Sequence, residues 1–203
     1  MNPYKHAEIS VKNWGGKIED YYPIHQFMDC TKEVCSDNRH RILHTHWGIF
    51  RVINPIFGEV ISNSDGKLIN VKDLCERDHI LPDFKNKFIP TLADFVACIE
   101  EREIDDWKQK IETLHQKYAS SKQVKDILLS PLHLTGQLKA LLLTHNSWFL
   151  NYILPKIQPI EIQLLDFEIS AHEIFQAMRF ELWMDNGTTF PPSANKLNQI
   201  KTF

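Results

Sequence analysis

Apolar residues recur at helical spacing along most of this 203-residue chain, in segments that prolines interrupt. In the stretch 37–54, Ile42, Leu43 and Trp47 begin an apolar pattern that stops before Pro55. The residue before a proline avoids the helical region, so Pro55 is expected to end its helix, like the prolines at 82, 131 and 155. The sequence therefore predicts helices over about 21–35, 37–54, 71–81, 89–118, 123–130, 136–154 and 170–184.

One short region changes from helical to alternating spacing. Val60 and Ile61 precede an Asp-Gly pair at 65–66, and Leu68 and Ile69 follow it. An Asp-Gly pair between short apolar runs is a strong hairpin signal. The chain has only 7 glycines, which argues against a sandwich or barrel with many turns. A further strand is a candidate at 160–169.

We therefore predict a mainly α fold. A compact helical domain with one small β-hairpin is expected over residues 1–103, and an added C-terminal helical half over 104–203 is expected to pack on it. The sequence does not predict the oligomeric state.

Composition excludes several classes of function. Charged residues make up 24% of the chain and the net charge is −3, so no basic field favours duplex DNA or RNA as a partner. No window approaches the roughly 18 apolar residues of a membrane-spanning helix. The first residues contain no apolar leader and none of the four cysteines forms a Cys-x-x-Cys pair, so we expect a reduced, cytoplasmic protein without membrane association.

Histidines and carboxylates form three pairs at helical spacing. The pairs are His25 with Asp29, His40 with His44, and Glu76 with His79. Each spacing projects both side chains from one helical face, which a metal ion bound between helices requires. Such nitrogen and carboxylate ligation suits zinc, manganese or iron, and the ion would activate a bound water for hydrolysis. The candidate metal ligands are His25, Asp29, His40, His44 and His79.

The competing interpretation is that these are surface or capping histidines, because the known metal motifs are incomplete. The chain has one Glu-x-x-His, whereas helical di-iron proteins need two copies and two further glutamates. His-Glu-x-x-His is absent. The His-Asp dipeptide of one metal-dependent phosphohydrolase family occurs only in reverse, as Asp78-His79. On a helix His46 is rotated by about 120° from His40 and by about 160° from His44, so we expect it outside any site.

Two arginines bracket His40. Arg39 and Arg41, together with Lys32, could bind a phosphate or another small anion. The alternative is that they are solvated helix charges near Glu33 and Asp37. No glycine-rich phosphate loop of the known kinds occurs in the chain.

Five stretches of the first half carry a family resemblance: WGGKIEDYYPIHQFMDCTK, DNRHRILHTHWGIF, FGEVISNSDGKLINVKDL, DHILPDF and IPTLADF. Through them residues 1–103 resemble an uncharacterised bacterial and phage domain of unknown function (DUF6915-like). The resemblance implies no activity. It implies an intracellular protein of phage or mobile-element origin, and it implies as family-motif positions His25, Asp29, Arg39, His40, Arg41 and His79.

The second half raises a separate question. ELWMDNG (181–187) is similar to a segment that follows IPTLADF more directly in relatives, so residues 104–180 are either an insertion or a degenerate second copy. THWGIF at 45–50 resembles THNSWF at 144–149, and a proline follows each, at 55 and 155. Such an echo between two helices also arises by chance.

Two functional hypotheses follow. The first is a metal-binding protein or metal-dependent hydrolase with a His/carboxylate site between helices. The alternative is a non-enzymatic binding or inhibitor protein of the anti-defence type, which acts on a protein partner or on a small anionic ligand.

Overall fold

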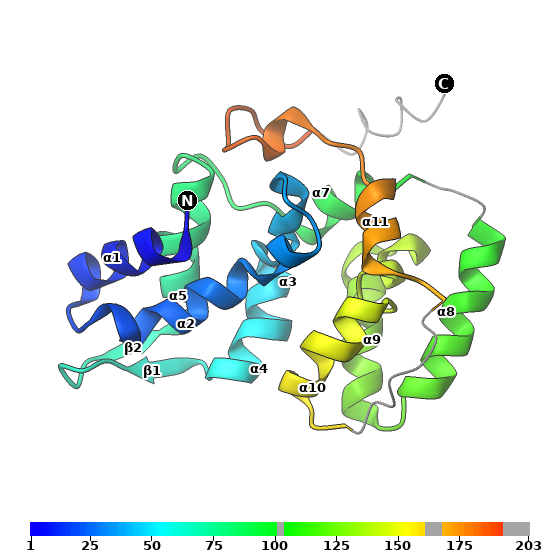
Figure 1. Ribbon diagram of the computed structural model, residues 1–203, viewed down its shortest axis with the longest axis horizontal. Helices are drawn as coiled ribbons and strands as arrows, with labels where there is room; N and C mark the ends of the chain where they lie inside the picture. The colour runs from blue at the N-terminus through cyan, green and yellow to red at the C-terminus, as the bar shows by residue number, and fades with distance from the viewer. Residues whose placement is uncertain (101–103, 161–167, 193–203) are drawn as a thin grey trace. The chain divides into compact units, whose positions relative to one another are not determined.

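The computed structural model describes residues 1–100, 104–160 and 168–192, and Figure 1 shows its helices and its hairpin. The chain forms two compact units. Unit 1 comprises Met1–Thr91 and the segment that begins at Phe180, and unit 2 comprises Leu92–Arg179. The predicted division into 1–103 and 104–203 stays a prediction. None of the described helices is long and apolar enough to cross a bilayer.

The predicted mainly α fold with one hairpin is confirmed, with eleven α-helices among the described residues. In unit 1 several helices join end to end through π-helical turns, so that 46–57 and 71–83 are each continuous. The elements of unit 1 are α1 (Pro3–Trp14), α2 (Ile18–Met28), 3-10 turns Cys30–Glu33 and Asn38–Leu43, α3 (His46–Gly48), π turn Ile49–Ile53, α4 (Asn54–Phe57), β1 (Val60–Ser62), β2 (Leu68–Asn70), α5 (Val71–Leu74), π turn Cys75–Ile80, α6 (Leu81–Asp83) and 3-10 turn Leu182–Met184.

The regular elements in the described part of unit 2 are helices and helical turns, and one isolated antiparallel bridge joins Ile99 to Met178. The elements of unit 2 are α7 (Leu92–Ala97), α8 (Ile104–Tyr118), α9 (Lys122–Thr135), 3-10 turn Leu138–Leu143, π turn Phe149–Ile153, α10 (Leu154–Ile157) and α11 (Ala171–Ala177). The candidate strand at 160–169 falls mostly on residues 161–167, which lie outside the described residues.

The hairpin forms where the sequence predicts it. β1 and β2 are antiparallel, with Ile61 opposite Ile69. Gly66 adopts a positive φ of 76°, which a glycine tolerates without steric cost, and its N–H donates to the carbonyl of Asn63 (2.9 Å). Ile69 is 1% exposed, so the face of the hairpin that carries its side chain packs against the core.

Several prolines lie inside helices, so the prediction that helices end before them was wrong. Pro55, Pro82 and Pro155 each lie two residues after the end of a π-helical turn, and Pro131 lies within α9. A proline lacks an N–H and its ring clashes with the carbonyl four residues earlier. A π turn widens the backbone at that point, so the helix can continue through the proline. The helix that contains His79 therefore continues as far as Asp83.

The same succession of backbone types occurs in both units, about 100 residues apart. A 3-10 turn, a capping residue, a π turn and a proline-containing helix follow one another at 38–57 and again at 138–157. Thr45 and Asn146 cap the two helices, and a histidine immediately precedes each cap, His44 in unit 1 and His145 in unit 2. The stretches THWGIF and THNSWF lie within this repeated succession, but they align 99 residues apart, whereas the two caps lie 101 residues apart.

α1 packs along α2 and against the π turn Cys75–Ile80. Asp78, which is fully buried, accepts hydrogen bonds from Asn13 Nδ2 (2.7 Å) and Trp14 Nε1 (2.6 Å) at the end of α1. These bonds hold α1 in register with the helix 71–83. Consequently the buried face of α1, which includes His6 and Ser10, is directed into unit 1.

Gly48 sets how closely the helix 46–57 approaches the turn before it. A Cβ at position 48 would lie 2.2 Å from the carbonyl oxygen of Leu43, a backbone atom that cannot move aside easily. We expect Gly48→Ala to lower the free energy of unfolding by about 1–3 kcal/mol, because overpacking forces the backbone to shift. Urea denaturation measures the change. Arg51→Ala, at an exposed position one turn later, should change it by no more than about 0.5 kcal/mol. Equal losses in the two variants would contradict the prediction.

Candidate metal centre

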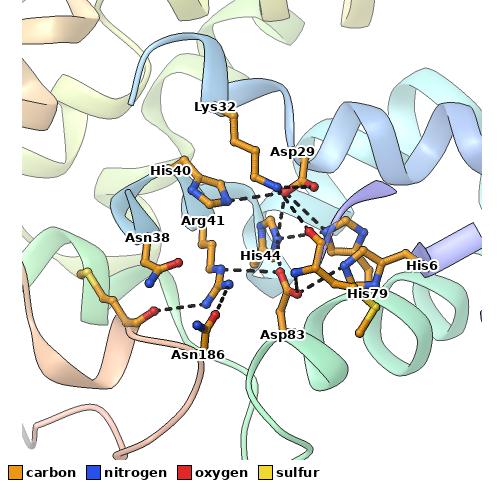
Figure 2. A network of polar contacts seen from close by, with 12 residues as sticks. His6, Asp29, Lys32, Asn38, His40, Arg41, His44, His79, Asp83 and Asn186 are labelled. Carbon is orange, nitrogen blue, oxygen red and sulfur yellow. Dashed lines mark hydrogen bonds and ion pairs between the residues drawn. The ribbon is translucent and has the colours of Figure 1, made fainter. Parts of the chain in front are cut away.

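Separate helices and turns of unit 1 bring a set of polar side chains together in its interior (Figure 2). α1 supplies His6, α2 and the residue after it supply His25 and Asp29, and the 3-10 turn Asn38–Leu43 and the residue after it supply His40, Arg41 and His44. The helix 71–83 supplies His79 and Asp83. Each of these side chains belongs to a residue that is at most 4% exposed.

Four residues form a central cluster: Asp29, His44, His79 and Asp83. Each offers one ligand atom, and these atoms lie within 4.8 Å of one another. His44 Nε2 is 3.0 Å from His79 Nε2, 3.4 Å from Asp83 Oδ2 and 3.7 Å from Asp29 Oδ1. His79 Nε2 is 3.8 Å from Asp29 Oδ1. The central cluster is the one group of this kind among the described residues, and it could hold a metal ion.

Two outer histidines, His6 and His40, are held by backbone carbonyl groups. His6 Nδ1–H donates to the carbonyl of Asp78 (2.7 Å), and His40 Nδ1–H donates to that of Asp37 (2.5 Å). The Nε2 atom of each ring is buried and has no hydrogen-bond partner. Metal-binding histidines typically have this arrangement, because the fixed Nδ1–H leaves the other nitrogen bare and oriented.

A chain of hydrogen bonds from Ser10 through His25 orients the His79 ring at its Nδ1 atom. Ser10 Oγ–H donates to the carbonyl of His6 (3.2 Å), so it accepts from His25 Nε2–H (2.8 Å). His25 Nδ1 is therefore an acceptor, and it receives a bond from His79 Nδ1–H (3.0 Å). His79 thus presents an unprotonated Nε2 to the other members of the central cluster. His25 is not a member of this cluster and contacts it through His79 Nδ1.

Protonation states in the central cluster suit metal binding, which requires neutral imidazoles and ionised carboxylates. Burial lowers the pKa of His44 to about 4 and holds that of His79 well below its usual range. Burial opposes ionisation of the two carboxyl groups, but contacts with His40 and His79 hold the pKa of Asp29 well below its usual range. His44 and His6 do the same for Asp83.

Cations surround the two carboxylates. Lys32 Nζ lies 2.6 Å from Asp29 Oδ2, and Lys32 is the more exposed partner, with 38% of its side chain accessible against 3% for Asp29. Arg41 Nε lies 3.5 Å from Asp83 Oδ2, and the α-amine of Met1 lies 2.5 Å from Asp83 Oδ1. The side of the centre that faces solvent is therefore the side of Lys32 and Met1.

Arg39 and Arg41, the predicted anion-binding residues, differ in their surroundings. Arg39 pairs with Asp37 (2.6 Å) near the surface. Arg41 is 3% exposed, and its guanidinium donates to the carbonyl of Met184 (3.1 Å) and to Asn186 Oδ1 (2.9 Å). Arg41 thereby connects Asp83 to the segment that begins at Phe180, and its N–H groups bind groups of the chain itself.

One of the three sequence pairs, Glu76 with His79, is divided in the structure. Glu76 does not accompany His79 into the centre but pairs with His46 Nε2 (2.8 Å), whose side chain is 56% exposed. His46 therefore lies outside the centre, as expected from its rotation. Asp83 takes the place of Glu76.

Sequence reasoning missed His6 and Asp83. Asp83 follows His79 by four residues, the same spacing that identified His25 with Asp29, but Pro82 suggested that the helix had ended. His6 has only Ser10 as a partner at helical spacing, and its polar contacts with Asp78 and Asp83 join it to residues more than 70 positions away. The signal for Asp83 was thus present in the sequence, whereas the signal for His6 was not.

A second histidine pair lies in unit 2. His145 Nδ1–H donates to the carbonyl of Leu141 (3.0 Å), and His145 Nε2 accepts from His115 Nδ1–H (3.0 Å). A cavity of about 290 Å³ adjoins the pair, and both apolar residues, such as Leu138, and polar residues, such as Glu112, line it. Among the described residues, no carboxylate joins these histidines in the metal-like geometry found in unit 1.

The pH dependence of unit 2 should reflect His145. Burial lowers its pKa to about 4, whereas an unfolded histidine has a pKa near 6.5. Between these values only the unfolded chain takes up the proton, so stability is lost as pH falls from about 6.5 towards 4. We expect His145→Gln to remove up to about 3 kcal/mol of this loss in urea denaturation at a series of pH values. Exposed His172→Gln is the control. A His145→Gln profile parallel to that of the wild type would refute the expectation.

The two arginines offer a matched comparison. Arg41→Met should lower the free energy of unfolding by about 3–5 kcal/mol, because it leaves the buried Asp83 carboxylate and the Met184 carbonyl without a partner. Arg39→Met removes a pair near the surface and should cost no more than about 1 kcal/mol. Urea denaturation measures both, and similar losses would show that Arg41 does not have this role.

Comparison with known families bears on residues 1–108, which match the family model described as a domain of unknown function (DUF6915). No curated protein and no solved structure matches the chain. The match confirms the resemblance noted in the sequence. It covers more than half of the chain and includes every residue of the metal centre from His6 to Asp83. The chain therefore belongs to the DUF6915 family.

Proposed function

We propose that unit 1 binds a divalent transition-metal ion through the central cluster. The separations between ligand atoms support this assignment most directly. Two atoms bonded at about 2.1 Å to one ion lie roughly 3.0–3.4 Å apart at angles of about 90° to 110°. His44 Nε2 lies 3.0 Å from His79 Nε2 and 3.4 Å from Asp83 Oδ2, both within this range, and 3.7 Å from Asp29 Oδ1, slightly above it.

Direct ion pairs between these groups explain the geometry less well. A hydrogen bond from an imidazolium to a carboxylate is about 2.7–2.9 Å long. The distances from histidine nitrogens to Asp29 and Asp83 are 3.3–3.8 Å, and both Asp29 oxygens and one Asp83 oxygen have no hydrogen bond. Buried carboxylates without such bonds are costly unless a cation compensates them. Lys32 and the Met1 amine already compensate Asp29 Oδ2 and Asp83 Oδ1, and an ion would do the same for Asp29 Oδ1 and Asp83 Oδ2, the oxygens that face the imidazoles of the cluster.

The donor set restricts the choice of metal. Two imidazole nitrogens and two carboxylate oxygens suit zinc, manganese or iron, and calcium and magnesium prefer oxygen alone. None of the four described free cysteines is a member of the central cluster. This absence removes the thiolate ligands that dominate structural zinc sites.

Hydrolysis is the chemistry that this donor set supports best. When bound, the ion would lower the pKa of a coordinated water towards 7 and so provide a nucleophile at neutral pH. His25 and Ser10 would hold His79 in the tautomer that keeps its Nε2 available. Lys32 lies between Asp29 and solvent, so a substrate would approach from that side and its negative charge would be attracted there.

Metal binding is tested by elemental analysis of chain that is treated with EDTA, reloaded separately with Zn²⁺, Mn²⁺ or Fe²⁺, and desalted. We expect at least one ion per chain in the wild type and none in the double variant His44→Ala, His79→Ala. The bound ion should also raise the melting temperature, because it binds the folded state alone.

The matched control is His46→Ala with His172→Ala, which removes two exposed histidines and should leave the metal content unchanged. A wild type that retains no more metal than the central double variant would refute the proposal. It would favour the alternative, a non-enzymatic protein that acts on a protein partner or a small anion. Metal-dependent cleavage of bis(p-nitrophenyl) phosphate, lost in the central double variant, would support the hydrolase assignment.

A further inference from the structure

The centre contains more donor atoms than one ion can use. Besides the central cluster, His6 and His40 direct buried, unpartnered Nε2 atoms at it. His6 Nε2 lies 3.3 Å from Asp83 Oδ1, and His40 Nε2 lies 3.5 Å from Asp29 Oδ1. Each outer histidine thus faces a different carboxylate.

The six donors cannot all bind the same ion. Two ligands on opposite sides of one ion are about 4.2 Å apart, since each bond is about 2.1 Å long. His6 and His40 are not members of the group whose ligand atoms lie within 4.8 Å of one another. Figure 2 shows them on opposite sides of the central cluster, His40 beside Asp29 and His6 beside His79.

The donors divide naturally into two equal sets. Asp29 Oδ1 lies near His40 Nε2 (3.5 Å) and His79 Nε2 (3.8 Å). The two oxygens of Asp83 lie near His6 Nε2 (3.3 Å) and His44 Nε2 (3.4 Å). Each set therefore has two imidazole nitrogens and one carboxylate, a combination that binds a single transition metal and leaves open positions.

We propose that the centre holds two metal ions, one bound by Asp29, His40 and His79 and the other by Asp83, His6 and His44. This inference rests on the proposed metal-binding function. The two sets meet at His44 and His79, whose Nε2 atoms are 3.0 Å apart, so the ions would be near neighbours, as in two-metal hydrolases with ions about 3.5–4 Å apart.

Charge then indicates the class of substrate. Two divalent ions with Arg41 and Lys32 outweigh the two carboxylates, and a buried excess of positive charge requires an anion. An oxyanion that bridges both ions, such as the phosphoryl group of a phosphoester, fits this requirement. The reaction would then be hydrolysis of a phosphoester bond.

The experiment is a titration of EDTA-treated full-length chain with Co²⁺, followed by visible absorbance and checked by elemental analysis. We expect the wild-type signal to saturate at two equivalents, and the His6→Ala and His40→Ala variants to saturate at one. His46→Ala is the matched control and should keep two. Manganese-loaded wild type should show the paramagnetic resonance signal of a coupled pair, which the two outer-histidine variants should lack.

The outcomes separate the two proposals. Saturation of the wild type at one equivalent would overturn the two-ion centre and leave the proposed metal binding intact. No saturable binding would overturn both. The wild-type end point requires no variant, so the result does not depend on how well His6→Ala or His40→Ala folds. Circular dichroism of each variant, with His6→Gln as a second substitution, shows whether a lost equivalent is local.

Discussion

The burial of two ionised carboxylates, Asp29 and Asp83, is the constraint on which the rest of unit 1 depends. A lone carboxylate in a protein interior is too costly to remain charged. Here lysine, arginine and imidazole groups from separate segments surround both side chains. Lys32 lies three residues after Asp29 and compensates it locally, whereas the partners of Asp83 come from α1 and from the turn before His44. Full compensation of Asp83 therefore requires that these separate segments pack together.

Backbone carbonyl groups determine which nitrogen each histidine presents. The carbonyls of Asp78 and Asp37 take up the Nδ1–H groups of His6 and His40, and His25 takes up that of His79. Since these acceptors belong to neighbouring helices and turns, the fold itself sets the tautomers. Low exposure adds a second effect, because it keeps the imidazoles of His44 and His79 neutral and strengthens the electrostatic interactions within the cluster. Geometry and protonation therefore both favour ligation of a metal.

Local signals made the fold class and the hairpin predictable, because apolar periodicity and the Asp-Gly turn act over a few residues. The helical pairs also pointed to His25, Asp29, His40, His44 and His79. Asp83 was missed because Pro82 ordinarily ends a helix, and a π turn, which has no clear sequence signature, removes that conflict. His6 could not be predicted, since its place depends on how α1 packs against a helix more than 60 residues away. Which histidine nitrogens face the carboxylates likewise depends on long-range contacts.

The succession of turn, cap, π turn and proline helix also occurs in unit 2, where no His/carboxylate cluster accompanies it among the described residues. Leu141 precedes His145 by four residues, as His40 precedes His44, and the backbone follows the same course in both places. In unit 2 the buried Leu141 and Leu142 and the hydrogen bonds from Thr144 and Asn146 to backbone carbonyls stabilise it. The same backbone arrangement thus occurs twice, once beside the central cluster in unit 1 and once in unit 2 without such a cluster among the described residues. It follows that this local succession of turn, cap, π turn and proline helix does not by itself require the buried carboxylates of unit 1.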